Sequence, residues 1–491
     1  MRFIFSLILI LSTCFINLKA QNPQKTLTLD DVITIAKKQS PDGLVAINKF
    51  KSSYWQFRTY KASFMPMLSF NATMPNINRS ISKITNPDGS QSFVETKSTD
   101  YSAKMSLSKT IGLTGGQISI NSGLERLDVF SATNTTSYLS NPVTIGFNQP
   151  LFSYNSYRWA NKIQPLMYNE AKQQYLEDIE LLSMKATNLF FDLLDAQIRA
   201  HIAKVNQANN DTLYKIAKGR YNLGKIAENE LLQLELSLLN SNLQLEQTRN
   251  EVEVALFKLK SFLGIKSNEK IELIIPQQIM NIKIDIEKAV AEARNNRTDA
   301  IAFDRKLIEA RSNVNRARTE NRFNANIYAL YGLTQSANTY NAVYKSPLDQ
   351  QQLSLGLQVP ILDWGLAKAK IKVAESNQEL VNTQIAQQKI DFDQEIMIKA
   401  MQFNMQYSQL LISAKADTIG EKRFLVTKER YMIGKLNITD LNIAMTEKDV
   451  ASQSYLSALR SFWNNYFEMR RLTLYDFINN STLNVDFETM K

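Results

Sequence analysis

An internal repeat constrains the fold of this 491-residue chain more than any other feature of its sequence. The segment Lys218–Lys225 recurs as Lys428–Lys435, and the match extends to Leu231 and Leu441 with six identities in fourteen positions. A match of this length at a fixed offset indicates that the chain is a duplication of one structural unit.

Upstream of these segments the offset is larger, because Leu29–Val32 resembles Ile286–Ala289. The first repeat therefore contains 47 extra residues, between about Thr73 and Asn141. Each repeat is predicted to contain a helix, two strands joined by a loop, a very long helix, a turn and another long helix. The predicted organisation is a signal peptide at 1–20, a first repeat at 21–264 with an extra strand hairpin at about 100–125, a linker at 265–285, a second repeat at 286–476 and a C-terminal tail at 477–491.

Long helices are predicted where apolar residues recur in steps of three and four, at 179–203, 231–262, 392–431 and 441–472. Two such runs joined by a short turn predict an antiparallel coiled-coil hairpin. Only 15 Gly and 11 Pro interrupt the chain, and residues 154–223 would span about 105 Å as one helix. Apolar residues also occur outside the repeating positions, at Phe190, Phe191 and Leu194. They indicate a second packing face on this helix, which fits a closed cylinder of helices better than an isolated pair.

Strands are predicted where apolar and polar residues alternate, at 68–74, 143–147, 327–333 and 353–361. One apolar and one polar face over about ten residues is typical of strands in a membrane barrel with a wet lumen. Four strands per chain cannot close such a barrel, and open sheet edges are not tolerated in lipid. Several chains would therefore have to share one barrel.

The extra residues of the first repeat contain two more alternating runs, at 101–107 and 118–124. They are joined through Thr114-Gly115-Gly116, which is typical of a hairpin turn. This extra hairpin either adds strands to the barrel or lies outside or inside its wall, and the sequence leaves these alternatives open.

The N-terminus has the pattern of a secretory signal peptide. Arg2 precedes an apolar run that extends from Phe3 to Ile16, and Ala20 offers a small residue for cleavage. An alternative is lipidation of Cys14, which the bulky Thr13 before it disfavours. Beyond residue 20 no run approaches the roughly 18 apolar residues of a membrane-spanning helix, so an exported chain of this kind would enter a bilayer only as strands.

The composition argues against catalysis. Cys14 and His201 are the single cysteine and histidine of the sequence, which leaves no set of residues for a zinc site, a nucleophilic pair or a disulfide framework. The glycine-rich segment Gly112–Gly116 lacks the lysine of a phosphate-binding loop. The formal charge of +10 is not concentrated in basic runs, so nucleic acid is not expected as a partner. We expect no enzyme activity, no cofactor and no metal.

Two motifs recur with the repeat. They are Arg-Tyr-x-x-Gly at Arg220–Gly224 and Arg430–Gly434, and the strand-to-helix junctions Gln149–Phe152 and Val359–Gly365. In this order and spacing, from about Leu27 to Tyr475, they resemble the TolC family of outer-membrane channel proteins. The resemblance implies a homotrimer in which four strands per chain form a twelve-stranded β-barrel in outer-membrane lipid. That barrel would continue into a periplasmic α-helical barrel about a hundred ångströms long.

The same resemblance places the two Arg-Tyr-x-x-Gly segments at periplasmic tips, where the family's channel closes and adaptor proteins dock. It implies a gate or constriction at Tyr431, Asp440, Tyr221 and Glu230, and hairpin-tip or adaptor contacts at Gly224, Lys225, Gly434 and Lys435. Three copies of Asp440 around one axis would form a carboxylate ring that attracts cations.

Three alternatives for these tip residues remain open. Asp440 could be a solvated or helix-capping acid, the two tyrosines could pack within the coiled coil, and the two lysines could meet only water. Leu436 and Ile443 stand where the family has a basic residue and a second acid. Closure would then depend more on apolar packing than on salt bridges.

The function that follows from the resemblance is an outer-membrane exit duct of a tripartite efflux or type I secretion system. Such a duct is passive and is opened by a periplasmic adaptor and an inner-membrane transporter, either a proton-driven pump or an ABC exporter. The alternative is an exported coiled-coil scaffold or periplasmic adaptor without a pore. Efflux and protein secretion are not distinguished by the sequence.

Overall fold

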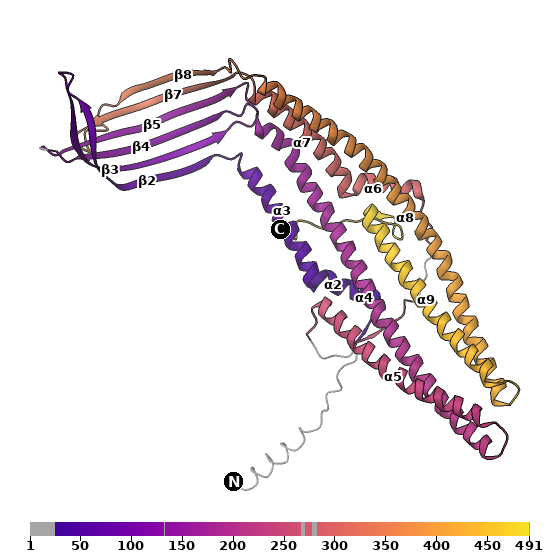
Figure 1. Ribbon diagram of the computed structural model, residues 1–491. Helices are drawn as coiled ribbons and strands as arrows, with labels where there is room; N and C mark the ends of the chain where they lie inside the picture. Colours follow the sequence, from indigo (N-terminus) through magenta and orange to yellow (C-terminus); the bar gives the residue numbers. More distant parts are fainter. Residues whose placement is uncertain (1–24, 132, 267–270, 277–281, 491) are drawn as a thin grey trace, which may run out of the picture. The chain divides into compact units, whose positions relative to one another are not determined.

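The computed structural model describes residues 25–131, 133–266, 271–276 and 282–490 (Figure 1). The predicted signal peptide at 1–20, with Cys14, lies outside these residues. The chain divides into two compact units. The first unit contains the residues up to Lys51, Lys172–Ala300 and Ile390 onward, and the second contains Ser52–Ala171 and Ile301–Lys389.

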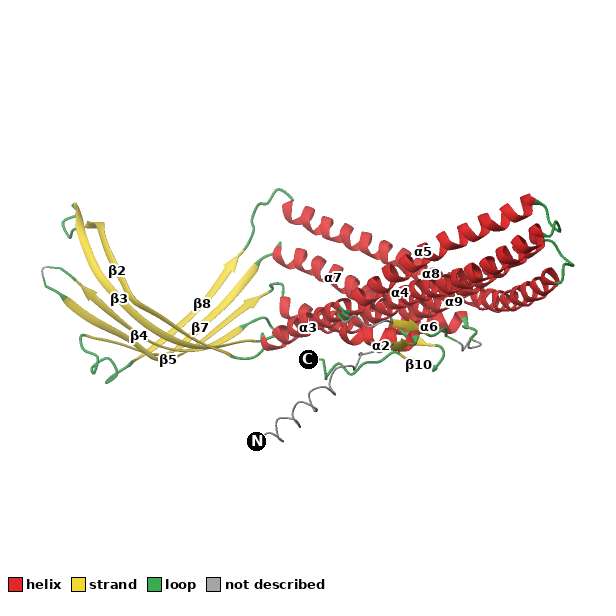
Figure 2. Ribbon diagram, turned by 90° about the horizontal axis from the view of Figure 1, so that it is seen from below, coloured by secondary structure: helices red, strands yellow, loops and turns green. Residues whose placement is uncertain are grey.

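The second unit contains an antiparallel sheet of six strands in the order β2–β3–β4–β5–β7–β8 (Figures 1 and 2). Each strand pairs with its neighbours in this order, so β2 and β8 form the two edges of the sheet. The strands are β2 (Met67–Thr85), β3 (Gln91–Thr110), β4 (Gln117–Val129), β5 (Thr135–Leu151), β7 (Asn324–Ala337) and β8 (Leu348–Gln358).

The sheet has two strands more than the resemblance implies. β3 and β4 come from the extra residues of the first repeat, and they lie in the sheet between β2 and β5. The expectation of four strands per chain is therefore wrong, and the hairpin near residues 100–125 adds strands to the sheet. The sequence could not decide this, because alternation indicates that a strand has two faces but not which neighbours it pairs with.

The long helices repeat at the predicted offset. α4 (Ser156–Asn222) and α8 (Leu366–Met432) have 67 residues each, and α5 (Glu228–Leu263) and α9 (Ile438–Thr473) have 36 each. The bounds of α8 and α9 follow those of α4 and α5 at the same offset as the repeated motif. The shorter helices are α2 (Leu29–Gln39), α3 (Pro41–Ala62), α6 (Ile286–Asn296) and α7 (Thr298–Glu320), and α6 follows α2 at the larger offset predicted for the upstream part of the repeat.

The core of the first unit is built around α4. Phe190, Phe191 and Leu194 are at most 2% exposed, so the predicted second packing face of this helix is buried. Among the described residues no helix combines the length and the apolarity that crossing a membrane requires. Short strand pairs complete this unit: β1 (Lys25–Leu27) with β6 (Ile271–Leu273), and β9 (Tyr475–Asp476) with β10 (Ser481–Thr482).

A buried network of charged groups joins three elements of the first unit. Arg470 of α9 donates from Nη2 to Glu180 Oε1 of α4 at 3.1 Å and from Nη1 to Asp476 Oδ2 of β9 at 3.0 Å. Glu180 is 3% exposed and Asp476 5%. Burial alone would raise the pKa of Asp476, but hydrogen bonds from Asn479 and from the Tyr466 hydroxyl outweigh it and hold that pKa below its usual value. The network therefore depends on Arg470, because its removal would leave two buried carboxylates without the cation that they share.

Candidate functional site

The two hairpin turns, from α4 to α5 and from α8 to α9, have the same hydrogen bonds. In the first turn Gly224 N donates to Tyr221 O and Lys225 N to Arg220 O; in the second, Gly434 N donates to Tyr431 O and Lys435 N to Arg430 O. This pattern is a Schellman motif, which ends a helix by placing one residue in the left-handed region. Gly224 and Gly434 occupy that position, with φ of 65° and 76°. The repeated Arg-Tyr-x-x-Gly motif thus encodes a helix stop.

Replacing Gly434 by alanine is expected to destabilise the second turn by about 1–2 kcal/mol, because an L-residue in this region brings its Cβ against the backbone. Gly219 is a matched control inside α4, with open space where a Cβ would stand, and alanine there should be neutral or stabilising by up to about 1 kcal/mol. Amide hydrogen exchange measures the difference: relative to the unmodified protein, exchange should be faster at the second turn in Gly434→Ala and should not be faster at the first turn in Gly219→Ala. Equal exchange in both variants would contradict the assignment of Gly434 as the left-handed residue of the helix stop.

An apolar cluster holds the ends of the two hairpins together. It consists of buried side chains from all four long helices: Leu213, Ala217, Leu234, Phe424, Tyr431, Ile438 and Leu441. Tyr431 is 4% exposed, and burial, with a smaller contribution from the nearby charge of Glu230, raises the pKa of its hydroxyl. The tip of one hairpin is therefore packed against the tip of the other.

Polar contacts across the same junction join the first repeat to the second. Arg220 Nη2 donates to the carbonyl of Met432, the last residue of α8, at 3.4 Å. Lys428 Nζ donates to Asn209 Oδ1 at 2.9 Å. A cation at a helix C-terminus satisfies carbonyl groups that have no partner within the helix. Arg220 was not singled out from the sequence, although its place in the repeated motif could have identified it.

The structure separates the residues that the resemblance assigned to a gate. Tyr431 lies in the apolar cluster, whereas Tyr221 is 39% exposed. Asp440 is exposed in the first turn of α9, and its backbone N–H donates to Asn437 Oδ1 at 2.8 Å. Glu230 is half-buried in the first turn of α5. Carboxylates at these two positions stabilise their helices through the helix dipole, independently of any pore.

The sheet of the second unit is apolar on one face. One row of paired residues crosses five strands, and each side chain in it is between 38% and 63% exposed: Leu68, Leu107, Ile120, Ile145 and Tyr331. On the same face of β8, Leu353, Leu355 and Leu357 are between 66% and 80% exposed. Exposed apolar surface that continues across a sheet marks contact with lipid or with protein.

The opposite face of the sheet is polar. A paired row crosses all six strands with Ser69, Ser106, Asn121, Thr144, Gly332 and Gln350. Ser106 Oγ donates to Asn121 Oδ1 at 2.6 Å. The alternation predicted from the sequence is therefore present, and it gives the sheet the two faces of a barrel wall with lipid on one side and water on the other.

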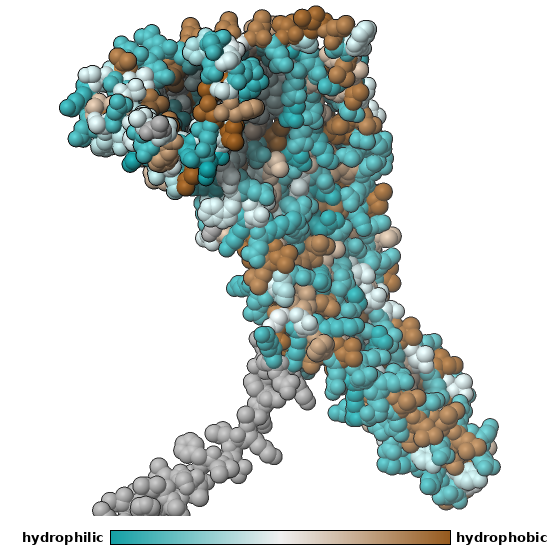
Figure 3. Space-filling view, turned by 60° about the vertical axis from the view of Figure 1, so that its left-hand side comes forward, coloured by the Kyte–Doolittle hydropathy of each residue, from teal (hydrophilic) through white to brown (hydrophobic). Residues whose placement is uncertain are grey.

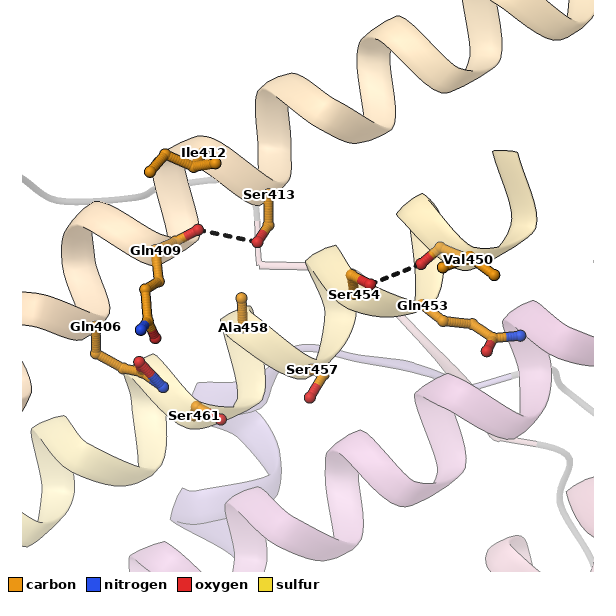
Figure 4. Close-up of a pocket in the computed structure, with 10 residues that line it drawn as sticks. All are labelled: Gln406, Gln409, Ile412, Ser413, Val450, Gln453, Ser454, Ser457, Ala458 and Ser461. Atoms are coloured by element: carbon orange, nitrogen blue, oxygen red, sulfur yellow. Dashed lines mark hydrogen bonds between the residues drawn. The ribbon is translucent and has the colours of Figure 1, made fainter. Parts of the chain in front are cut away.

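A groove of about 560 Å³ lies between α8 and α9 (Figure 4). Seven of its ten lining residues are Gln or Ser. Ser413 Oγ donates to Gln409 O, and Ser454 Oγ to Val450 O, so both hydroxyls are satisfied by their own helices. The groove is thus a wettable surface along the second hairpin. Figure 3 shows hydrophobic side chains in several patches, one of them near the lower ends of the long helices.

Solved outer-membrane channels share this fold. The CmeC outer membrane channel of Campylobacter jejuni matches with a TM-score of 0.65 and 17% identity, over 94% of this chain and 88% of that one. The outer membrane protein VceC of Vibrio cholerae matches with 0.59 and 13%, over 93% and 97%. The MtrE outer membrane channel of Neisseria gonorrhoeae matches with 0.54 and 15%, over 91% and 88%. No curated protein sequence gives a significant match.

Duplicated long helical hairpins and a two-faced antiparallel sheet therefore define a chain of the outer-membrane channel fold. Residues 32–265, from α2 to just beyond the end of α5, match the sequence model of the outer membrane efflux proteins. The match to this model covers the first of the two repeats, and the resemblance drawn from the repeated motifs is confirmed.

Proposed function

We propose that this chain is the outer-membrane exit duct of a tripartite efflux or type I secretion system. The observation that carries the proposal is the sheet, because an apolar face, a polar face and two open edges suit a wall shared between copies in lipid. In this proposal the sheet lies in the outer membrane and the long helices lie in the periplasm. The duct is passive, and its energy comes from an inner-membrane transporter.

The long helices expose two apolar stripes that such an assembly would bury. The α5 stripe consists of Leu232, Leu236, Leu239 and Leu243, each 55–60% exposed. The α8 stripe consists of Ile398, Met405, Ile412, Ile419 and Val426, each 48–70% exposed. Both follow the heptad spacing of helix packing, so each stripe offers a surface for another helix.

The repeat supplies a template for how the stripes meet. Within the chain, α4 packs on α9 through Asn206 Nδ2, which donates to Asp449 Oδ2, and Asn464 Nδ2, which donates to Asn188 Oδ1. In the repeat, α8 corresponds to α4 and α5 corresponds to α9. The contact between α4 and α9 within a chain therefore predicts an equivalent contact between α8 of one copy and α5 of the next. The polar pairs then become apolar pairs: Ala416 with Leu239, and Ile398 with Val254. We propose a homotrimer closed by this contact.

The packed hairpin tips are the proposed gate of the duct. Arg220 secures the junction within a chain, and its counterpart Arg430 would face the carbonyl of Asn222 in the next copy. Tyr431 contributes apolar packing, while Tyr221, Glu230 and Asp440 would line the opening between copies. Gly224, Lys225, Gly434 and Lys435 are the proposed surface for the tips of a periplasmic adaptor.

Conductance across a planar bilayer tests this gate. Replacing both Arg220 and Arg430 by alanine is expected to raise single-channel conductance several-fold, because junctions within and between copies are loosened together. Replacing Asp440 by alanine should weaken cation selectivity if three carboxylates line the opening. Alanine at the exposed Lys422 of α8, away from the turns, is the control. Unchanged conductance in the double variant would reject the tips as the gate.

Fractionation tests the proposal as a whole. We expect trimers that resist heating in detergent, recovered from the outer membrane, because the apolar face of the sheet requires lipid. Recovery as a monomer in the soluble periplasmic fraction would contradict the duct and would favour a scaffold or adaptor without a pore.

A further inference from the structure

The strand count of this chain has a consequence for the width of the channel. The sheet has six strands, and its edges, β2 and β8, each have a neighbour on one side only. The exposed apolar side chains extend to both edges, with Leu68 and Phe70 on β2 and Leu353 and Leu355 on β8, each at least 63% exposed. An edge of this kind in lipid has to pair with another strand.

We propose that three copies close a single wall of eighteen strands, in which β8 of each copy pairs with β2 of the next. This inference rests on the proposed function. The occupant of each edge is a second copy of this chain. When β8 pairs with β2 of the next copy, the apolar side chains of both strands lie on one face of the wall and their polar side chains lie on the other.

The direction of the strands permits this closure. Neighbouring strands in the sheet are antiparallel throughout, and the number of strands is even, so β8 runs opposite to β2. Pairing β8 with the next copy's β2 therefore keeps the whole wall antiparallel, as membrane barrels require. Three, four or any number of copies satisfy this condition, and the proposed trimer sets the count at eighteen.

The additional strands, β3 and β4, are integral to the sheet. β3 is paired along almost its whole length with β2, from Ser108 to Gln91, and β4 is paired from end to end with β3 and almost as fully with β5. Moving this hairpin out of the wall would break its ladders with both β2 and β5. The apolar row also passes through it without interruption, by way of Leu107 and Ile120.

A wider exit follows from the extra strands. Barrel diameter grows roughly in proportion to strand number, so eighteen strands give a lumen about one and a half times as wide as twelve. Barrels of 16–18 strands enclose an open aqueous channel. We infer that the outer-membrane part of this duct admits larger solutes than a twelve-stranded barrel would, while passage stays limited at the helical tips.

Disulfide trapping tests the edge pairing. Ser69→Cys on β2 is combined in turn with Gln350→Cys, Gln352→Cys or Ser354→Cys on β8, all on the polar face. Within one chain the two edges are five strand spacings apart, about 24 Å, which excludes an internal disulfide. Oxidation of the full-length protein in membranes should link three copies into a covalent ring for at least one pair. Ser106→Cys with Ser354→Cys is the control, because β3 already has two neighbours.

A shortened variant tests the width. Asn78 of β2 and Thr135 of β5 lie in the same row of the sheet, because Asn78 pairs with Ser98, Ser98 with Val129, and Val129 with Thr135. Replacing residues 79–134 by an Asn-Gly turn would therefore join β2 to β5 and leave four strands. The largest polyethylene glycol that enters from the extracellular side should be about one and a half times wider for the full chain than for this variant.

The outcomes separate the two proposals. Membrane trimers that show no ring with any cysteine pair, or a wall of twelve strands in single-particle images, would overturn the eighteen-stranded wall and leave the duct in place. Protein that is monomeric and outside the membrane would overturn both. Covalent rings together with images of eighteen strands would establish the inference.

Discussion

Replacing Leu236 and Leu243 by aspartate is expected to prevent three copies from assembling, while each chain keeps its helices. Both leucines belong to the exposed α5 stripe, so the folded chain tolerates a charge there. In the proposed trimer each aspartate would be buried against the α8 stripe of the next copy, at a cost of about 2 kcal/mol or more. Together this corresponds to a loss of roughly a thousandfold in the association constant. Native mass spectrometry in detergent measures the distribution of monomers and trimers.

A control on the same helix separates charge from position. Gln233 and Gln244 are exposed on the flank of α5, between the stripe and the face that packs on α4. Aspartates at these two positions add the same charge and should leave the trimer intact. If both double variants assemble like the unmodified protein, the α5 stripe is not a contact between copies.

Replacing Arg470 by alanine should lower the free energy of unfolding of the first unit more than any other single change proposed here. Alanine at this position leaves the buried carboxylates of Glu180 and Asp476 without their shared cation, and breaking a buried pair in this way typically costs about 3–5 kcal/mol. Thermal unfolding followed by circular dichroism at a helical wavelength reports the loss. Arg423→Ala is the matched control, because its pair with Glu447 is about half exposed and is worth at most about 1 kcal/mol.

The pH dependence gives a second readout of the same network. The pKa of Asp476 is lower in the folded protein than its reference value of 3.8, so its carboxylate contributes stability that is present above pH 3.8. That contribution is lost as the pH falls toward the lower folded pKa. The difference in stability between Arg470→Ala and the unmodified protein should therefore shrink below about pH 4. A difference that does not change with acidity would contradict the ion-pair network.

Much of the fold could be predicted because its signals are local and duplicated. Heptad spacing and the constant offset of the repeat were sufficient for the four long helices, whose bounds follow that offset. Alternation was sufficient for the two faces of the strands, as the paired row from Ser69 to Gln350 demonstrates. The partners of β3 and β4 could not be predicted, because strand pairing is a long-range choice that sequence alternation does not encode.

Some features of the hairpin tips could likewise be predicted from the sequence and others could not. The repeated motif predicted the positions of Gly224 and Gly434, and their positive φ angles explain why glycine is needed there. The motif could not predict that Tyr431 would be buried and Tyr221 exposed, because the two occupy equivalent places in the repeat but opposite sides of one junction. That asymmetry arises only when one hairpin packs on the other. In the proposed trimer it would make the contact between copies differ from the contact within a chain.

The proposed function requires this chain to form a channel through the outer membrane. Its most direct test is the insertion of the purified full-length protein into a planar lipid bilayer, with the unmodified chain and the Arg220→Ala, Arg430→Ala variant compared side by side. We expect discrete conductance steps for both proteins, small for the unmodified chain and several-fold larger for the variant. If neither protein gives conductance steps after its insertion into the bilayer has been verified, this chain does not form a channel.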